Sequence, residues 1–437
     1  MKRKNNKMIK WSFWAMALTG ILLTSCDDTD DVEVDSGAFS IYDYVQIATG
    51  QTILYDNNGD VVSSLAEGDA FYGQDASYLK GASMNYVDNG DSTITDNNTG
   101  LMWEEIPIPS SLTYDEAVAY CENLVLAGYD DWRMPSLKEL FSISDFGRGW
   151  PYLDTTYFKL ATGIVDKSEQ FWSSNRYVGV TTEGQDNAAF GVNHVTGHIK
   201  AYPAASVMEG DEGGPIGGGP QGDSGDAPGD EGDDVVVGTP PPGGVEGQVM
   251  DSPLAKHVRA VRGDVYGEND FKDNGDGTIS DDGTGLMWSQ NDSGEGLNWE
   301  DALAYAENAE LGGYTDWRLP NVKELQGIVD YSYAPGATDV NNEGPAIDPI
   351  FSCTPIINEA GLDDYGYYWT GTSANFTKDE PYYYAWYVAF GRAVDGDGHD
   401  THGAGAVRFD TKYEGGPLGE GGERYYNYVR LVRNMSE

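Results

Sequence analysis

The sequence has few basic residues for its length. Against 72 Asp and Glu residues it has only 26 Lys and Arg, and its formal net charge is -46. The phosphates of nucleic acids and the sulfates of polysaccharides are themselves negative, so such a surface repels them. The composition therefore excludes nucleic acid as a partner and disfavours sulfated glycans. A solvated acidic surface accounts for the charge, and binding of divalent cations by some acidic loops is the alternative.

Cysteine and the signatures of common enzymes are also scarce. The three cysteines, Cys26, Cys121 and Cys353, are too few for a disulfide framework. The patterns GxSxG of hydrolases, HExxH of zinc proteases and the phosphate-binding P-loop do not occur. Nothing singles out one pair of carboxylates for hydrolysis. The sequence therefore favours a protein that is not an enzyme, and a hydrolase or modifying enzyme is the less favoured alternative.

The N-terminus has the features of an export signal. After a basic start, residues 11–23 form an apolar run that is too short to span a bilayer, and the sequence LTSC that ends at Cys26 resembles the bacterial lipobox. We predict a signal peptide at residues 1–25, lipid on Cys26 and an acidic tether at residues 26–43. The expected protein is exported and lipid-anchored in the bacterial envelope, at the outer membrane or cell surface. An ordinary signal peptide is the alternative.

A segment of the chain occurs twice, 185 residues apart. DNGDSTITD returns as DNGDGTISD, and TGLMW, which holds Trp103, returns with Trp288. DWRMP returns as DWRLP, KEL follows both, and each copy ends in a VRxVR sequence. Repetition of this kind indicates two tandem copies of one domain. We expect domain 1 at residues 44–265 and domain 2 at residues 266–437.

Residues 209–248 are rich in Gly, Pro and Asp and contain almost no large apolar side chains. This composition is typical of disordered segments, which cannot bury enough apolar surface to fold. The segment precedes the closing VRxVR of the first copy. We therefore interpret it as a disordered loop inserted in domain 1, and not as the linker between the two domains.

Each copy is expected to be an α+β domain with two helices, short antiparallel strands and long loops. A hairpin at the DNGD turn comes first. Apolar spacing predicts helices at residues 114–126 and 299–311, and Ser or Asn after Pro predicts second helices at residues 136–144 and 321–329. Aromatic strands follow, and the VRxVR strand closes each copy. DNGDGTISD lacks the first and last ligands of a calcium loop, which favours a simple turn.

These motifs resemble those of the Lcl C-terminal domain family. The DNGDGTISDDGTGLMW, WRLPNVKEL and WRMPSLKEL blocks, the WSS and WTG strands and the VRxVR ends carry the resemblance, over nearly all of residues 44–437. The family is named for a collagen-like bacterial adhesin. The resemblance implies a C-type-lectin-like fold and attachment to host glycans. The WRLP block is also similar to that of formylglycine-generating enzymes, but their pair of active-site cysteines has no counterpart here.

The cysteine positions depart from the family pattern. Members often have one cysteine in the first helix and another in the closing strand, and the resemblance implies that these two pair. In this sequence Cys121 takes the helix position, but Ala260 stands in the strand. In the second copy Ala306 and Leu431 occupy both positions. We therefore expect Cys121 to be a buried free thiol.

Residues 395–402 hold the densest cluster of candidate metal ligands. Oxygen ligands at alternate positions suit calcium, and two histidines suit a transition metal. A solvated Gly-Asp loop is the favoured interpretation. A cation site, with calcium as the candidate cofactor, is the alternative. Its ligands would be Asp395, Asp397, His399, Asp400 and His402.

Aromatic residues gather at two places in the second copy. Sugars stack their apolar faces on aromatic rings, so an exposed set beside carboxylates would bind a glycan. Aromatic residues that alternate along a strand commonly pack in a core instead, and that interpretation stays open. The candidate ligand-binding residues are Tyr365, Tyr367, Tyr382, Tyr384 and Trp386.

The tryptophans of the repeated motifs, and the arginines that follow two of them, are expected to be structural. Each arginine would be neutralised by a carboxylate, Glu139 in the first copy or Glu324 in the second. The residues in this class are Trp103, Trp132, Arg133, Trp288, Trp317 and Arg318.

The favoured function is a binding or adhesion module on a membrane-anchored envelope lipoprotein, with a glycan or the extracellular matrix as ligand. A structural or docking subunit of an envelope protein complex is the alternative. This expectation rests on the family resemblance and on the acidic charge. The sequence contains no catalytic motif that would favour an enzyme instead.

Overall fold

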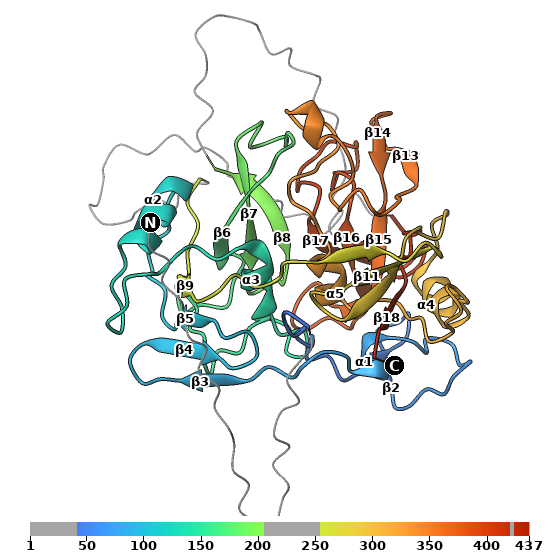
Figure 1. The fold of residues 1–437 in the computed structure, drawn as a ribbon, viewed down its shortest axis with the longest axis horizontal. Helices are drawn as coiled ribbons and strands as arrows, with labels where there is room; N and C mark the ends of the chain where they lie inside the picture. The colour runs from blue at the N-terminus through green and yellow to red at the C-terminus, as the bar shows by residue number, and fades with distance from the viewer. Residues whose placement is uncertain (1–41, 205–253, 420–423, 437) are drawn as a thin grey trace, which may run out of the picture. The chain divides into compact units, whose positions relative to one another are not determined.

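The computed structural model describes residues 42–204, 254–419 and 424–436 (Figure 1). The predicted signal peptide, Cys26 and most of the tether lie outside the described residues, as does the predicted loop at 209–248. The described part consists mainly of antiparallel β-strands with five short α-helices, in two halves that follow the sequence repeat. No helix in this part has the length and apolar character needed to cross a membrane.

The elements follow the two repeats after a short lead-in segment, residues 42–85. The lead-in contains β1 (Leu54–Tyr55), β2 (Val61–Val62) and α1 (Asp75–Tyr78). The first repeat contains β3 (Tyr86–Asp88), β4 (Thr93–Asp96), β5 (Met102–Glu104), α2 (Tyr114–Asn123), α3 (Leu137–Ser142), β6 (Gln170–Arg176), β7 (Ala188–Asn193), β8 (Ile199–Pro203) and β9 (Val261–Arg262).

The second repeat has the same order with three additional short elements, η1, β13 and β14. It contains β10 (Phe271–Asp273), β11 (Thr278–Asp281), β12 (Leu286–Ser289), α4 (Trp299–Glu307), α5 (Val322–Gly327), η1 (Val340–Asn342), β13 (Pro355–Ile357), β14 (Asp363–Tyr365), β15 (Tyr367–Ala374), β16 (Tyr384–Ala389), β17 (Val407–Thr411) and β18 (Val432–Asn434).

Each repeat opens with a hairpin and closes by adding its last strand to that hairpin. The resulting four-stranded sheets have the orders β3-β4-β5-β9 and β10-β11-β12-β18. In the first sheet Trp103 lies opposite Val261, and in the second Trp288 lies opposite Val432. The predicted hairpin at the DNGDGTISD turn is confirmed, since β10 pairs antiparallel with β11. The beginning and end of each repeat therefore meet in one sheet.

The helices begin where the sequence predicts and end earlier. Asn321 caps α5, because its side chain accepts a hydrogen bond from the main-chain N–H of Glu324. α4 ends at Glu307 and not at the predicted residue 311. Beyond the C-cap at Asn308 the chain enters a tight turn, in which the main chains of Leu311 and Tyr314 bond to each other. The first repeat has the equivalent cap on α3 and the equivalent turn after α2.

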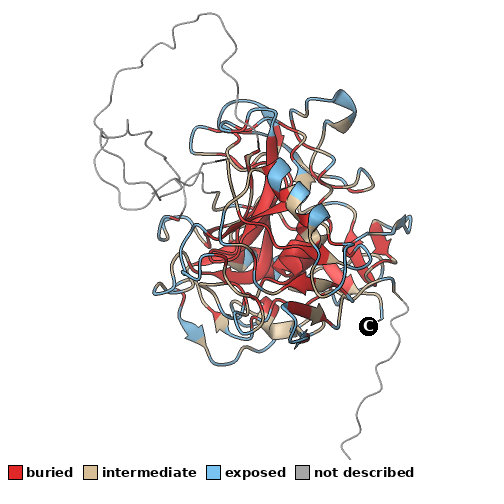
Figure 2. Ribbon diagram, turned by 90° about the vertical axis from the view of Figure 1, so that its left-hand side faces the viewer, coloured by how far each residue is buried: buried red, intermediate tan, exposed pale blue. Residues whose placement is uncertain are grey.

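A six-stranded antiparallel sheet runs through both repeats. Its order is β15-β16-β17-β8-β7-β6, so each repeat supplies three strands and β17 lies beside β8 (Figure 1). Val407 pairs with Ile199, and the main-chain N–H of Ala201 donates to the carbonyl of His402. Every residue of β7 and β16 is buried, and Figure 2 shows the buried residues gathered along the central strands. The two repeats therefore belong to one compact unit.

Aromatic side chains of both repeats pack against one another. Trp386 of the second repeat meets Phe146 and Tyr152 of the first, with ring centroids 5.3 and 5.5 Å apart. Phe190 of the first repeat meets Tyr331 of the second at 4.8 Å. One hydrophobic cluster thus continues across the repeat boundary. Separating the repeats would expose these rings to water, at a cost of about 25 cal/mol per Å² of apolar surface.

The lead-in segment packs on the second repeat, although the first repeat follows it in sequence. The side-chain amide of Gln51 exchanges two hydrogen bonds, of 2.9 and 2.8 Å, with the main chain of Ser373. The buried carboxyl of Asp75 accepts hydrogen bonds from the hydroxyls of Thr49 and Thr372. Burial raises the pKa of Asp75 to about 6, and the two hydroxyls act in the opposite direction. The lead-in therefore connects the two repeats a second time.

The first arginine of each VRxVR sequence is fully buried. Arg430 donates to the main-chain carbonyls of Ser289, Gln290 and Ser352, at 2.8 to 2.9 Å. Arg259 makes the three equivalent contacts in the first repeat. A guanidinium in the interior needs acceptors for its N–H groups, and the carbonyls need donors. Each arginine therefore holds its closing strand against the neighbouring strand and loop.

Cys121 is buried and forms no disulfide, as its departure from the family pattern predicted. It packs in the same hydrophobic cluster as Ala260. The equivalent cluster of the second repeat contains Ala306 and Leu431. Apolar packing between the helix and the closing strand therefore stands at both places where the family pattern implies a disulfide.

Replacing Arg430 with Met should lower the free energy of unfolding by about 3–5 kcal/mol, because three buried carbonyls lose their donors. The matched control is Arg262→Met, since Arg262 binds Asp131 at a partly exposed position, and its loss should cost about 1 kcal/mol or less. Urea unfolding of the full-length protein measures both. Equal losses in the two variants would contradict the role given to Arg430.

Candidate functional site

The predicted metal ligands at residues 395–402 do not meet at one point. The Oδ1 atom of Asp395 accepts hydrogen bonds of 3.0 Å from the main-chain N–H groups of Asp397 and His399, which closes a surface turn. The carboxyl of Asp400 is buried instead. It accepts the phenolic hydroxyl of Tyr177, from the first repeat, at 2.5 Å. The segment thus divides into an exposed turn and a contact between the repeats.

The structure does not assemble the cation site that the sequence left open. Across the described ranges, no group of three or more His, Cys, Asp or Glu side chains could hold a metal ion. The reason is that these side chains lie in different surroundings, since Asp397 and His399 are exposed whereas Asp400 is buried. The five candidate ligands that therefore do not meet at one point are Asp395, Asp397, His399, Asp400 and His402.

Three of the five aromatic residues predicted to bind a ligand are in the core. Tyr367, Tyr384 and Trp386 are at most 2% exposed, because neighbouring elements cover both faces of β15 and β16. The interpretation of these three as an exposed ligand platform is therefore corrected to core packing. Tyr382 is partly buried and stacks on a tyrosine of the lead-in, with ring centroids 4.1 Å apart. Tyr365 alone of the five lines a pocket described below.

The residues expected to be structural lie in the core or in ion pairs. Arg318 binds Glu324 through two hydrogen bonds of 2.7 Å. Arg133 binds Glu139 in the same manner, but its side chain is 31% exposed against 4% for Arg318. Tyr78 of the lead-in lies over the guanidinium of Arg318, 5.9 Å from ring centroid to charge, and contributes to this difference. The four tryptophans, each at most 3% exposed, are Trp103, Trp132, Trp288 and Trp317.

A groove of about 570 Å³ lies between the two repeats, and we call it the inter-repeat groove. The first repeat contributes the start of α3 and Asn175. The junction between the repeats, residues 265–269, crosses it. The second repeat contributes Phe271, the end of α5 with Asp330 and Tyr331, and a loop that carries Asp348. Its size falls in the range of small-molecule and sugar sites.

The contact between α3 and α5 positions the floor of this groove. Both helices carry the lysine of the repeated KEL sequence, and each lysine binds main-chain carbonyls. The Nζ atom of Lys323 donates to the carbonyls of Ser142 and Ala48, at 2.8 and 3.0 Å. That of Lys138 donates to the carbonyl of Gly267 at 3.0 Å and to the side chain of Asn269. The lysines therefore fix the segments that cross between the repeats.

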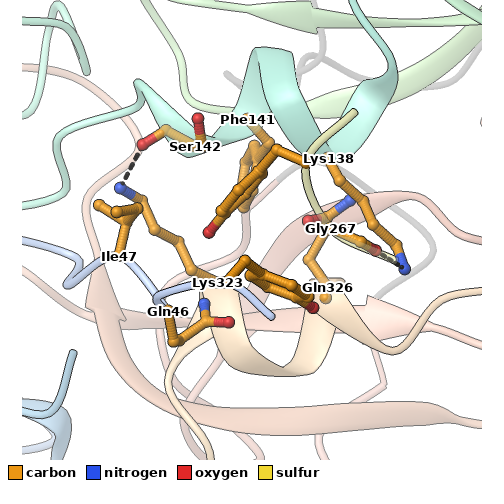
Figure 3. Close-up of a pocket in the computed structure, with 11 residues that line it drawn as sticks. Gln46, Ile47, Lys138, Phe141, Ser142, Gly267, Lys323 and Gln326 are labelled. Carbon is orange, nitrogen blue, oxygen red and sulfur yellow. Dashed lines mark hydrogen bonds between the residues drawn. The ribbon is translucent and has the colours of Figure 1, made fainter. Parts of the chain in front are cut away.

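A small inner cavity separates the two lysines. Figure 3 shows their side chains extending away from each other, with Phe141 and Gln326 between them. The cavity has about 20 Å³ of free volume, which is enough for about one water molecule. It shares Lys138, Tyr266 and Gly267 with the inter-repeat groove, so these residues form the boundary between the two.

Burial weakens the basicity of both lysines. It lowers the pKa of Lys138 to about 8 and that of Lys323 to about 7. The carboxylates of Asp281, Asp330 and Glu268 act on Lys138 in the opposite direction. The lining of the groove thus has three carboxylates, Asp330, Asp348 and Glu268, for one lysine that is already bonded. Its electrostatic character is acidic, as is that of the whole chain.

The groove carboxylates retain hydrogen-bonding capacity. Asp348 accepts the main-chain N–H of Ile350 through Oδ1, at 2.8 Å. Asp330 accepts the main-chain N–H and the hydroxyl of Ser332, also through Oδ1. Within the part of the chain that the structure describes, no donor is bonded to the Oδ2 atom of either residue. The turns therefore hold both carboxyl groups in place and leave one oxygen of each for a ligand.

A second hollow of about 280 Å³ lies in the second repeat, and we call it the aromatic pocket. Its lining includes the rings of Tyr333, Phe351 and Tyr365, with Glu343 as a carboxylate. Cys353 also lines it, and burial raises the pKa of its thiol. The arrangement offers flat apolar surfaces beside one acidic group.

Sequence reasoning missed the groove, because most of its residues stand in loops without a repeated pattern. Glu268, Asp330 and Asp348 follow no metal-ligand or catalytic spacing. One signal was present: the same lysine follows the WR(M/L)P block in both copies, at Lys138 and Lys323. A lysine at an otherwise apolar helix position indicates a buried contact, and in this fold that contact lies between the repeats.

The variant Asp400→Asn tests the buried contact between the repeats. Burial raises the pKa of Asp400 from 3.8 to about 7. The folded protein therefore keeps a proton that the unfolded chain releases, so this group stabilises the fold at low pH and that stability is lost as the pH rises to about 7. An amide does not titrate. Wild-type stability relative to the variant should fall by about 1.4 kcal/mol per pH unit between about pH 5 and 7.

Urea unfolding across that pH range measures this difference for the full-length protein. Asp397→Asn, on the exposed part of the same loop, is the matched control and should show no such trend. If the difference in unfolding free energy between wild type and Asp400→Asn does not vary with pH, Asp400 does not have a raised pKa in the folded protein.

Comparison with known proteins places the chain in a family. The model of the Lcl C-terminal domain matches residues 92–208 and 277–433, one range in each of the two repeats described above. No curated protein and no solved structure matches the chain. The matched ranges cover more than half of the sequence, and both contain the second strand of the hairpin, the two helices and the aromatic strands. The chain therefore belongs to the Lcl C-terminal domain family, of which it carries two tandem copies.

Proposed function

We propose that this protein is a surface lipoprotein, held in the bacterial envelope by lipid on Cys26, that binds neutral glycans in the inter-repeat groove. The observation that carries the proposal is the groove itself. It combines carboxylate and amide groups with aromatic rings in about 570 Å³. This combination suits a sugar, which offers hydroxyl groups at its edge and apolar C–H groups on its faces.

The polar groups of the groove match the edge of a sugar ring. The Oδ2 atoms of Asp330 and Asp348 would accept hydrogen bonds from sugar hydroxyls, and Asn175 would supply an amide. Hydrogen bonds to a charged acceptor contribute about 1.5–3 kcal/mol each. The partly exposed ring of Phe271 lies in the same lining and would cover an apolar face.

The charge of the groove selects among glycans. Three carboxylates face one lysine whose ammonium group is bonded to the protein. An anionic sugar would meet like charges there and would also be repelled by the net charge of -46. Neutral glycans, including those of an extracellular matrix, avoid this cost. The protein would therefore discriminate against sulfated polysaccharides.

The proposal includes a C-type-lectin-like fold for each repeat. Two helices, short antiparallel strands and long loops in each repeat support this assignment, together with a hairpin that is closed by the last strand. Binding would not depend on calcium at residues 395–402, because Asp400 bonds to Tyr177 in the interior. Fold alone does not determine function, so the groove residues carry the proposal.

A glycan array probed with the full-length protein tests the proposal. Neutral oligosaccharides should be bound and sulfated ones should not, equally in calcium and in EDTA. Failure to bind any glycan would refute it. Recovery of the protein with a defined envelope complex in that case would favour a docking subunit instead.

The variants Asp330→Asn and Asp348→Asn should each weaken the binding of a neutral glycan by about tenfold or more, since a charged acceptor is lost while the turn is kept. Asp166→Asn is the matched control, because Asp166 holds a similar turn by accepting the main-chain N–H of Ser168 on the exposed surface. Isothermal titration calorimetry measures the three affinities. Unchanged affinity in both groove variants would show that the glycan does not bind in the inter-repeat groove.

A further inference from the structure

The aromatic pocket belongs to the second repeat alone. The segment between α5 and β15 has 39 residues, 328–366, and the equivalent segment between α3 and β6 has 27, residues 143–169. Every residue that lines the aromatic pocket lies between Tyr333 and Tyr365, within the longer segment. The two repeats are therefore not equivalent, and the second repeat carries a hollow that the repeat unit does not require.

The aromatic pocket adjoins the inter-repeat groove. Asp348 lines the groove, whereas its two neighbours in sequence, Ile347 and Pro349, line the aromatic pocket. The segment at residues 331–333 also contributes to both hollows, since Tyr331 lines the groove and Tyr333 lines the aromatic pocket. The same two short segments thus separate the hollows and contribute side chains to both.

Ring contacts support this adjacency. Phe271 lines the groove and Phe351 lines the aromatic pocket, and their rings pack edge to face with centroids 5.0 Å apart. Phe351 also lies against the buried guanidinium of Arg430. The partition between the hollows is therefore anchored to the core, and a ligand in one hollow would lie close to the other.

The chemistry of the aromatic pocket differs from that of the groove. Tyr333 and Tyr365 are partly exposed and offer ring faces, and Glu343 is the carboxylate beside them. One oxygen of Glu343 accepts the main-chain N–H of Gly336, at 3.0 Å, which orients the group. Flat rings with one oriented acceptor suit a sugar ring that stacks on one face and donates a hydroxyl at its edge.

We propose that the two hollows bind one ligand, a linear oligosaccharide that runs from the inter-repeat groove past Asp348 into the aromatic pocket, where one sugar ring stacks on Tyr365. This inference rests on the proposed function and adds the class of ligand, an extended chain and not a single terminal sugar. The second repeat then supplies most of the contacts, and the first repeat supplies one side of the groove.

A series of neutral oligosaccharides of increasing length tests the inference. Cello-, chito- and manno-oligosaccharides, from disaccharide to hexasaccharide, are titrated against the full-length protein by calorimetry. For at least one series the affinity should rise by about tenfold over the series, because longer chains gain the aromatic contact. Tyr365→Ala should abolish the rise, whereas Tyr365→Phe, which keeps the ring, should keep it.

The outcomes distinguish this inference from the proposed function. Tyr305→Ala, which removes an exposed tyrosine of α4, is the control and should behave as wild type. Binding of glycans with no dependence on length, or a length dependence that Tyr365→Ala retains, overturns the extended site and leaves the groove proposal standing. Absence of binding for every series overturns both.

Discussion

The pairing of β8 with β17 joins the two repeats into one six-stranded sheet. Neighbouring elements cover β7 and β16 on both faces, so neither repeat presents a free amphipathic surface there. The edges of the two half-sheets cover each other through Val407 and Ile199. The shared aromatic cluster and the lead-in segment reinforce the same contact. A tandem repeat thereby becomes one unit whose boundary creates a groove.

The electrostatics of that boundary follow from burial. Lys138 and Lys323 donate their ammonium groups to main-chain carbonyls and so fix the crossing segments. Of the two, only Lys138 lines the groove, where three carboxylates outnumber it. Asp330 and Asp348 are held by turns and remain able to accept hydrogen bonds. The groove is therefore acidic and preorganised, which favours an uncharged polar ligand over an anionic one.

The sequence predicted local structure and core residues better than it predicted the site. Capping residues, the DNGD hairpin and the Arg318–Glu324 pair follow from short-range patterns. The ends of the helices and the burial of Tyr384 and Trp386 depend on tertiary contacts, which no local pattern encodes. The groove could not be predicted because its residues come from both repeats and meet only after the six-stranded sheet forms. Asp400, expected in a surface loop, bonds to the other repeat for the same reason.

Hydrogen–deuterium exchange of the full-length protein, with and without a saturating neutral oligosaccharide, tests most directly whether the boundary between the repeats is the ligand site. Exchange should slow in the junction at residues 265–271 and in the segments at 328–333 and 347–351, since these line the two hollows. Protection confined to surfaces of a single repeat, such as the loop at 395–402, would contradict a site at that boundary.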